Sequence, residues 1–295
     1  MNPCKCDKKS YRIIIIEFSY GVQKIVSNLS VKEMISAGVH FGHQSKYWNP
    51  KMRPYIFTTY NKLHIINLDK SVEYFKLAIS YIEKLSKNNA KILFVGTKRA
   101  ARDIISEHAK NAGMPYVNNR WLGGMLTNFD TVKKSIQKLE GLKKHLEASK
   151  ILDNMSKKET LMIKKQITKL EKNLDGIKDL EKLPDALFVI DTRYEKIAIQ
   201  EANKLNIPVI AVVDSNNSFD GVDFMIPGND DSMSSIKLFV SEVSKTIKSN
   251  KTSVTSAKTE NQPSQGKKSL KKKQVIEVSN KSEKKEVVPK KTEND

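Results

Sequence analysis

The sequence predicts an α/β fold built around a parallel sheet. Three short runs are apolar throughout, at residues 92–95, 186–190 and 209–213. Helical patterns over residues 98–112 and 194–205 follow the first two of these runs. Strands without a polar face that alternate with helices are typical of a parallel sheet covered by helices on both sides. The predicted layout is Rossmann-like or flavodoxin-like.

The other elements are predicted from caps, breakers and periodicity. After an irregular N-terminal extension over residues 1–28, a capping box of Ser30 and Glu33 begins a helix that ends at Gly38. Residues 41–60 mix aromatic, basic and proline residues, and are predicted as an ordered loop followed by a short strand. The remaining predictions are strands at 64–68, 115–119 and 223–228, the last at an edge, and helices over 71–87 and 232–248.

No strand is predicted between about residues 129 and 180. Apolar residues recur there at three- and four-residue spacings, from Val132 to Leu146 and again from Ile163 to Leu174. Two such helices joined by a polar turn are predicted to form an antiparallel coiled-coil helical hairpin inserted into the domain. Its outer faces carry lysines that are either simply solvated or in contact with RNA or protein: Lys133, Lys134, Lys138, Lys143, Lys144, Lys164, Lys165, Lys169 and Lys172.

The chain is strongly basic. Its 295 residues carry a formal net charge of +19, from 52 basic and 33 acidic residues. Such a chain is expected to meet a polyanion, either nucleic acid or an anionic membrane surface. Residues 29–249 are predicted to form the α/β domain. Residues 250–295 contain almost no large apolar residues and are predicted to be a disordered Lys-rich tail.

Several classes of protein lack support in the sequence. There is no nucleophile elbow, no C-x-x-C pair and no glycine-rich phosphate loop, so an enzyme is not predicted. Cys4 and Cys6 cannot build a disulfide framework, which suits a reducing cytosol. The apolar run at residues 13–16 is too short for a membrane span or a signal-peptide core.

The stretch KILFVGTKRAAR, residues 91–102, joins a predicted strand to a predicted helix through Gly96. A turn that cradles a cofactor phosphate needs several glycines, and this one has basic residues in their place. Such a turn suits the backbone of a large RNA, or an acidic neighbour, better than a cofactor. Arginine binds phosphate through a planar fork, so the few arginines are informative. The candidate contacts to RNA or partner proteins are Lys46, Arg53, Lys98, Arg99, Arg102, Arg120, Lys133 and Lys134.

The stretch NNRWLGGMLTNFDT, residues 118–131, has two readings. Arg120, Trp121 and the neighbouring amides could stack on and hydrogen-bond with unpaired RNA bases. Alternatively, Trp121 and Phe129 anchor the core where the hairpin leaves the sheet. Both readings hold if Trp121 is buried and Arg120 is exposed.

A metal site is a second candidate for a functional site, besides the basic contacts to RNA or partner proteins. Asp191 and Asp214 each follow a predicted buried strand, and His43 lies in the N-terminal loop. Two carboxylates and an imidazole can bind zinc or a harder ion. The alternative, which the residues favour, is that the aspartates cap turns and the histidine bonds to the backbone. No cofactor is required by this interpretation.

Six stretches, in order and at compatible spacing, resemble the bacterial small-subunit ribosomal protein S-two family over roughly residues 29–249. They are AGVHFGHQSKYWNPKMRPYIF, NKLHIINLDKS, KILFVGTKRAAR, MPYVNNRWLGGMLTNFDTVKKSI, LPDALFVIDTRYEKIAIQEANKLNIPVIAVVDSN and IPGNDDSMSSI. The resemblance implies a parallel α/β domain with a protruding coiled-coil hairpin and no catalytic step.

The resemblance also implies a structural component of the small ribosomal subunit, cytoplasmic and ribosome-bound, on the solvent side near the head–body junction. Its implied partners are 16S-type ribosomal RNA, neighbouring ribosomal proteins and ribosomal protein S-one, and not DNA or a membrane. The chain departs from the family at Phe219, where proline is usual, and at Ser234, where arginine is usual. Residues 1–28 precede the usual family start, as a real extension or through a start site assigned too far upstream.

Two other functions stay open at this point. One is a nucleotide-binding regulator that uses the crevice at the ends of the strands, which the missing glycines disfavour. The other is a protein adaptor that uses the helical hairpin, which is compatible with a ribosomal role.

Overall fold

A computed structural model describes residues 29–152 and 156–259. Its main sheet has five strands, all parallel, in the order β5-β4-β6-β7-β8. The fold class predicted from the apolar runs is therefore confirmed. The strands are β4 (Ile92–Val95), β5 (Tyr116–Val117), β6 (Ala186–Ile190), β7 (Val209–Val213) and β8 (Phe224–Pro227).

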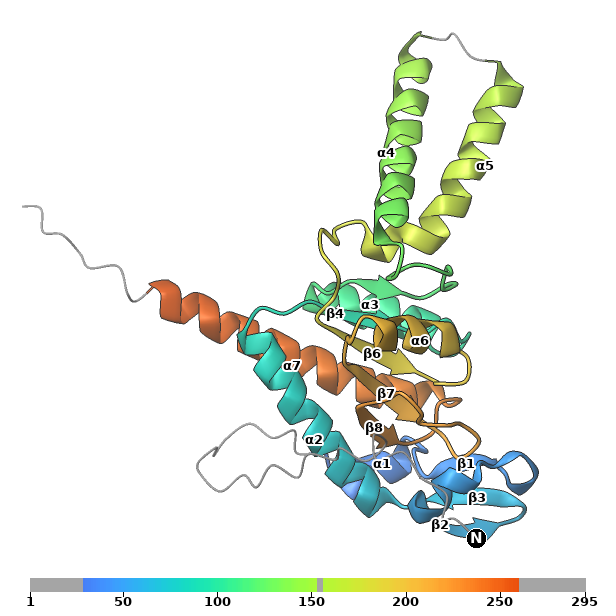
Figure 1. Cartoon of the computed structure of the whole chain (residues 1–295), viewed down its shortest axis with the longest axis vertical. Coiled ribbons are helices and arrows are strands. Elements are labelled where there is room, and N and C mark those ends of the chain that lie inside the picture. Colours follow the sequence, from blue (N-terminus) through green and yellow to red (C-terminus); the bar gives the residue numbers. More distant parts are fainter. Residues whose placement is uncertain (1–28, 153–155, 260–295) are drawn as a thin grey trace, which may run out of the picture.

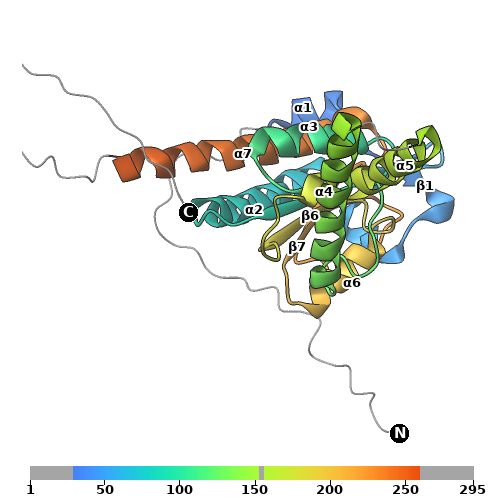
Figure 2. The same cartoon turned by 90° about the horizontal axis from the view of Figure 1, so that it is seen from above.

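Helices cover both faces of this sheet (Figure 1). One face carries α1 (Val31–Ser36), α2 (Leu68–Lys87), α3 (Arg102–Ala112) and α7 (Met233–Thr259). The other face carries α6 (Lys196–Lys204). Figures 1 and 2 show α2 and α7 as two long helices lying side by side. Among the described residues, no helix combines the length and apolar character needed to cross a bilayer.

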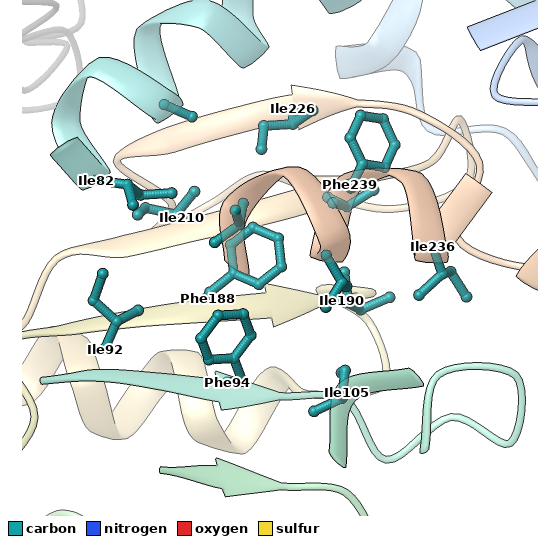
Figure 3. Packing of buried hydrophobic residues seen from close by; sticks show 14 of the residues in the cluster. Ile82, Ile92, Phe94, Ile105, Phe188, Ile190, Ile210, Ile226, Ile236 and Phe239 are labelled. Carbon is teal, nitrogen blue, oxygen red and sulfur yellow. The ribbon is translucent and has the colours of Figure 1, made fainter. Parts of the chain in front are cut away.

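The first core layer lies between the sheet and helices α2, α3 and α7 (Figure 3). The rings of Phe94 and Phe188, from neighbouring strands, pack with centroids 5.4 Å apart. Ile82, Ile105 and Phe239 close this layer from the three helices, and all five side chains are fully buried. Because each buried apolar side chain of this size contributes about 1.5–3 kcal/mol, the layer fixes the helices on the sheet.

A second core layer on the opposite face includes the base of the helical insertion. Leu187 of β6 and Ala198 of α6 share this layer with Trp121, Ile136 and Leu174. Trp121 is 7% exposed, so it is a core anchor as one of its two readings predicted.

Two helices, α4 (Phe129–Leu152) and α5 (Lys157–Leu174), occupy the predicted insertion and run side by side away from the sheet (Figure 1). A capping box of Ser156 and Glu159 begins α5, and Lys143 pairs with Glu171 across the two helices at 2.5 Å. The coiled-coil character of this pair stays a prediction.

A separate antiparallel sheet of three strands, in the order β1-β3-β2, was not predicted. It contains β1 (Phe41–Gln44), β2 (Ile56–Tyr60) and β3 (Leu63–Ile66), with short 3-10 helices at Ser45–Tyr47 and Pro50–Tyr55. The sequence placed the strand at 64–68 in the α/β series, which is wrong. Asn61 and Lys62 both have positive φ, 47° and 63°, so they form a tight turn that pairs this strand with the preceding one.

Some predicted helix ends also differ. Residues 98–101 form a turn, so α3 begins at Arg102, four residues later than predicted. Helix α7 continues to Thr259, past the predicted end at 248, because no glycine or proline interrupts residues 233–259. The predicted extension at 1–28 and most of the predicted tail, residues 260–295, lie outside the described residues.

The Glu201 carboxylate of α6 holds the loop that leads into α4. Its Oε1 accepts hydrogen bonds from the backbone N–H of Gly124 at 2.7 Å and from the indole N–H of Trp121 at 3.2 Å. Its Oε2 accepts from the backbone N–H groups of Leu126 at 2.9 Å and Thr127 at 3.3 Å. Burial raises the pKa of Glu201, but these donors outweigh it and leave the pKa below its usual range.

We expect Glu201→Gln to lower the free energy of unfolding by about 2 kcal/mol at pH 7, because an amide group would turn a donor toward backbone N–H groups. A carboxylate with a depressed pKa stabilises the fold above its unfolded-state pKa, and this contribution disappears as the pH falls through its folded-state pKa. The difference between wild type and variant should therefore shrink as the pH falls below 4.5. Urea unfolding across pH 3–7 measures it, with exposed Glu107→Gln as the control; equal effects of the two substitutions would contradict the assignment.

Candidate functional site

The carboxyl ends of the parallel strands meet at one edge of the sheet, and those of β4, β6, β7 and β8 are followed by buried polar residues. Thr97 follows β4, Asp191 follows β6, Asp214 follows β7 and Asp230 follows β8. The exposed fractions of these four residues are 4%, 7%, 1% and 0%. Three carboxylates thus lie buried at the edge where parallel sheets usually bind ligands.

Lys98 supplies the cation at the centre of this cluster. Its Nζ lies 2.8 Å from Asp230 Oδ1 and 3.4 Å from Asp191 Oδ2, and it also contacts Asp231. Although burial lowers the pKa of Lys98, the surrounding carboxylates outweigh it and raise the pKa. Lys98 was proposed as a contact to RNA or a partner; the structure places it against the protein's own carboxylates, with its side chain 20% exposed.

His43 lies between two carboxylates at the outer side of the cluster. Its Nδ1 is 2.9 Å from Asp214 Oδ2, and its Nε2 is 3.0 Å from Asp231 Oδ2. The pKa of His43 is raised, chiefly by its bond to Asp214. Gly42 permits this approach, because a Cβ there would lie 2.7 Å from Ser215 Oγ. The short HFGH segment therefore docks the small sheet onto the strand ends.

Negative charge exceeds positive charge in this cluster. Among the described residues, the carboxylates of Asp191, Asp214, Asp230 and Asp231 form ion pairs only with Lys98 and His43. Burial, and then the charges of Asp191 and Asp214, raise the pKa of Asp230 to about 7. A hydrogen bond offsets part of the cost of burying Asp230, since Asn217 Nδ2 donates to Asp230 Oδ2 at 2.7 Å.

The residues that could hold a metal ion are His43, Asp214, Asp230 and Asp231, each with one ligand atom within 4.8 Å of the others. Asp214 Oδ2 is buried and accepts no aligned hydrogen bond from the described part of the chain, despite its ion-pair contact with the imidazole. Mixed imidazole and carboxylate ligands suit zinc.

Asp191, also a predicted ligand, lies outside this set of four. Its Oδ1 accepts from the backbone N–H of Arg193 at 2.9 Å and of Tyr194 at 3.1 Å, and from Asn217 Nδ2 at 3.1 Å. It therefore caps the turn after β6, in a backbone conformation with φ of 70° that non-glycine residues rarely adopt. Asp230 and Asp231 were not predicted as ligands, although they follow the apolar strand β8 much as Asp214 follows β7.

In the turn after β4, the backbone N–H of Thr97 already donates to a carboxylate of the protein itself. Glu195 Oε1 accepts from Thr97 N at 2.7 Å and from Thr97 Oγ1 at 2.6 Å. A Cβ on Gly96 would lie 2.1 Å from Ile105 Cδ1, so this glycine serves the packing of α3 on the sheet. In a nucleotide-binding fold the equivalent donor would face a phosphate. The internal carboxylate disfavours the nucleotide-binding alternative.

Four cations gather beside this turn, around a hollow of about 600 Å³. They are Arg102 and Arg120, both predicted as RNA or partner contacts, with Lys169 and Lys172 of α5. None of the four forms an ion pair with a residue that the structure describes. We call this space the hairpin-foot hollow.

The other predicted contacts lie elsewhere. Arg99 is exposed in the turn before α3, and Lys134 is exposed on α4. Lys133 lies over the Phe129 ring, with 4.9 Å from Nζ to the centroid, and Lys46 lies 5.5 Å from that of Tyr47. Arg53 is exposed in a 3-10 helix beside the small sheet. The structure therefore distributes these residues over three regions of the surface.

The small sheet exposes three aromatic side chains, which was also not predicted. Phe57 is 73% exposed, Tyr60 67% and Phe41 46%. Large exposed aromatic side chains are common at contact surfaces.

Comparison with protein families agrees with this architecture. Residues 34–250 match the family described as Ribosomal protein S2. The chain belongs to the ribosomal protein S2 family. Membership identifies a ribosome-bound protein of the small subunit, with a structural rather than an enzymatic role. The matched region includes the main sheet, the helical insertion, the carboxylate cluster and the hairpin-foot hollow.

We expect Lys98→Met to lower the free energy of unfolding by about 3 kcal/mol at pH 8, because it leaves buried carboxylates without their cation. The loss should be smaller at pH 5, where protonation can remove the uncompensated charge. Thermal and urea unfolding at the two pH values measure it, with the exposed Lys237→Met on α7 as the control. A variant as stable as this control at pH 8 would show that Lys98 does not hold the strand ends together.

Proposed function

We propose that the protein binds small-subunit ribosomal RNA and neighbouring ribosomal proteins as a structural constituent of the small ribosomal subunit. The observation that carries the proposal is the family match over residues 34–250. The net charge of +19 and the arginines at the sheet edge supply the electrostatics that RNA binding needs.

The proposed RNA surface includes the hairpin foot and the exposed turn at Arg99. Arg99 and Arg120 are exposed, and neither pairs with a carboxylate in the described part of the chain. Exposed guanidinium groups bind phosphates bidentately, whereas a group already paired would first have to lose its partner. RNA of the A form presents its backbone and loops to a protein more readily than its base edges.

The exposed aromatic residues of the small sheet are the proposed contact for a neighbouring ribosomal protein. Phe57 and Tyr60 are two thirds or more exposed, and aromatic residues are enriched at protein interfaces. Ribosomal protein S-one is the partner that the family resemblance implies.

Of the two departures from the family, Phe219 packs edge-on against Tyr55 at 6.2 Å, whereas Ser234 is exposed, so an arginine contact at that position is absent.

We also propose that His43, Asp214, Asp230 and Asp231 bind a divalent cation, with zinc as the best match. The geometric support is the convergence of four ligand atoms within 4.8 Å. The electrostatic support is the excess of carboxylates over the two neighbouring cations. A bound ion would join the small sheet to the ends of β7 and β8, and so would act on stability.

We expect the double variant Arg99→Ala/Arg120→Ala to bind small subunits at least about tenfold more weakly, with a salt slope lower by about 2, since two phosphate contacts are lost. Sedimentation of the full chain with subunits depleted of it measures this. The pair Lys76→Ala/Lys237→Ala, exposed on α2 and α7, removes the same charge elsewhere.

Wild type should co-sediment stoichiometrically with the subunit, and failure to do so would overturn the proposed function. Normal incorporation of the arginine variant, with its thermal stability unchanged, would instead remove only these two contacts from it.

We expect the full chain to bind one Zn²⁺, and His43→Ala/Asp214→Asn to lose that binding. Cys4→Ser and Cys6→Ser are introduced in all proteins compared, because thiolates bind zinc tightly. Asp220→Asn is the control for loss of one carboxylate at an exposed position. Isothermal titration calorimetry measures stoichiometry, and thermal unfolding should show stabilisation by zinc only where the cluster is intact. Binding that survives in the double variant would place the ion elsewhere.

A further inference from the structure

The hairpin-foot hollow occupies a specific topological position. The chain passes from β4 to β5 on one side of the sheet, while β6, β7 and β8 extend the sheet on the other side. The two directions of winding separate between β4 and β6, and a crevice forms at the carboxyl ends of strands where this occurs. Thr97 and Glu195, which follow these two strands, both line the hollow. Its other wall is α5, which contributes Lys169 and Lys172.

The charge in the hollow is strongly unbalanced. Arg102, Arg120, Lys169 and Lys172 face a single carboxylate, Glu195. That carboxylate is 2% exposed and already accepts two hydrogen bonds from Thr97. It therefore neutralises little of the positive charge at the mouth, and an anionic group is the ligand that this lining favours.

The Arg102 guanidinium is held in one orientation. Its Nε donates to Thr97 O at 2.8 Å, and the described residues offer its two terminal nitrogens no acceptor. A planar guanidinium anchored through Nε presents its remaining N–H groups in a fixed fork, which suits a phosphate oxygen pair. Anchoring before binding reduces the entropy lost when the ligand arrives.

The remaining lining supplies groups that recognise a base. Tyr194 is 62% exposed at the hollow, so its ring is accessible for stacking. Asn119 donates through Nδ2 to Lys172 O at 3.1 Å, which fixes the amide and leaves its carbonyl oxygen as an acceptor. A volume of about 600 Å³ lies within the range of sites that accept one small organic group.

We propose that the hairpin-foot hollow binds one unpaired nucleotide of an RNA strand, with its phosphate between Arg102, Arg120 and Lys172 and its base on Tyr194. This inference rests on the proposed ribosomal function and adds the place and the kind of RNA element bound. An acidic peptide would satisfy the cations but would leave the exposed ring without a matching aromatic surface.

The first test is photochemical cross-linking with the full chain carrying Tyr194→p-benzoylphenylalanine, bound to small subunits depleted of the native protein. We expect a cross-link from position 194 to one short, unpaired stretch of RNA. The same substitution at Tyr81 of α2, which is stacked on Phe224 and does not line the hollow, is the control and should give no such cross-link. A cross-link only to protein, or no RNA cross-link from a subunit-bound protein, would overturn nucleotide binding in the hollow and leave the proposed function intact. A wild-type chain that fails to bind the depleted subunits would overturn both.

The second test compares two matched pairs of substitutions on α5. Lys169→Gln/Lys172→Gln removes charge from the hollow, and Lys164→Gln/Lys165→Gln removes the same charge from exposed positions outside its lining. With Tyr194→Leu added to the first pair, we expect subunit binding to weaken at least about fivefold relative to the second pair, since stacking on one base is lost in addition to phosphate contacts. Equal weakening would show that only non-specific attraction acts there and would overturn the proposal. Circular dichroism melting confirms that both variants are folded.

Discussion

The fold depends on the compensation of buried negative charge where the parallel strands end. Asp191, Asp214 and Asp230 come from three different strands and are at most 7% exposed. Parallel strands bring such residues to one edge whether or not their charges are compatible. Lys98, from the β4–α3 turn, and His43, from the small sheet, form ion pairs with these carboxylates and offset their charge. The same contacts that offset the charge therefore also attach the small sheet to the main one.

At the adjacent part of the edge, backbone and hydroxyl donors are buried, and the carboxylate of Glu195 accepts their hydrogen bonds. The strand–helix turn at Thr97 has the form of a phosphate-binding turn, yet Glu195 satisfies its donors. A fold common among nucleotide-binding proteins is thereby closed to a nucleotide at its usual position. The unpaired cations lie further out, at the mouth lined by Arg102, Arg120 and the lysines of α5.

The main sheet and its helices could be predicted because their signals are local. Apolar runs mark buried strands, and Gly113, with φ of 61°, ends α3 where the sequence indicated. The small sheet could not be predicted, because the Asn61–Lys62 turn lacks the glycine that usually marks a tight hairpin. The side-chain direction of Lys98 could not be predicted either. It depends on a turn at residues 98–101, where the periodicity of the sequence predicts a helix.

If the protein binds RNA as we propose, the partition of charge along one edge accounts for how a chain with so much positive charge is oriented on it. A uniformly basic surface would bind a polyanion in many poses, because attraction to phosphate carries no directional information. In that proposal the carboxylates near His43 would repel phosphate, while the adjacent hairpin-foot hollow would attract it. Like-charge repulsion at one end and a fixed guanidinium fork at the other favour a single pose. In the proposed RNA complex, the acidic cluster would therefore direct phosphate toward the hollow by exclusion.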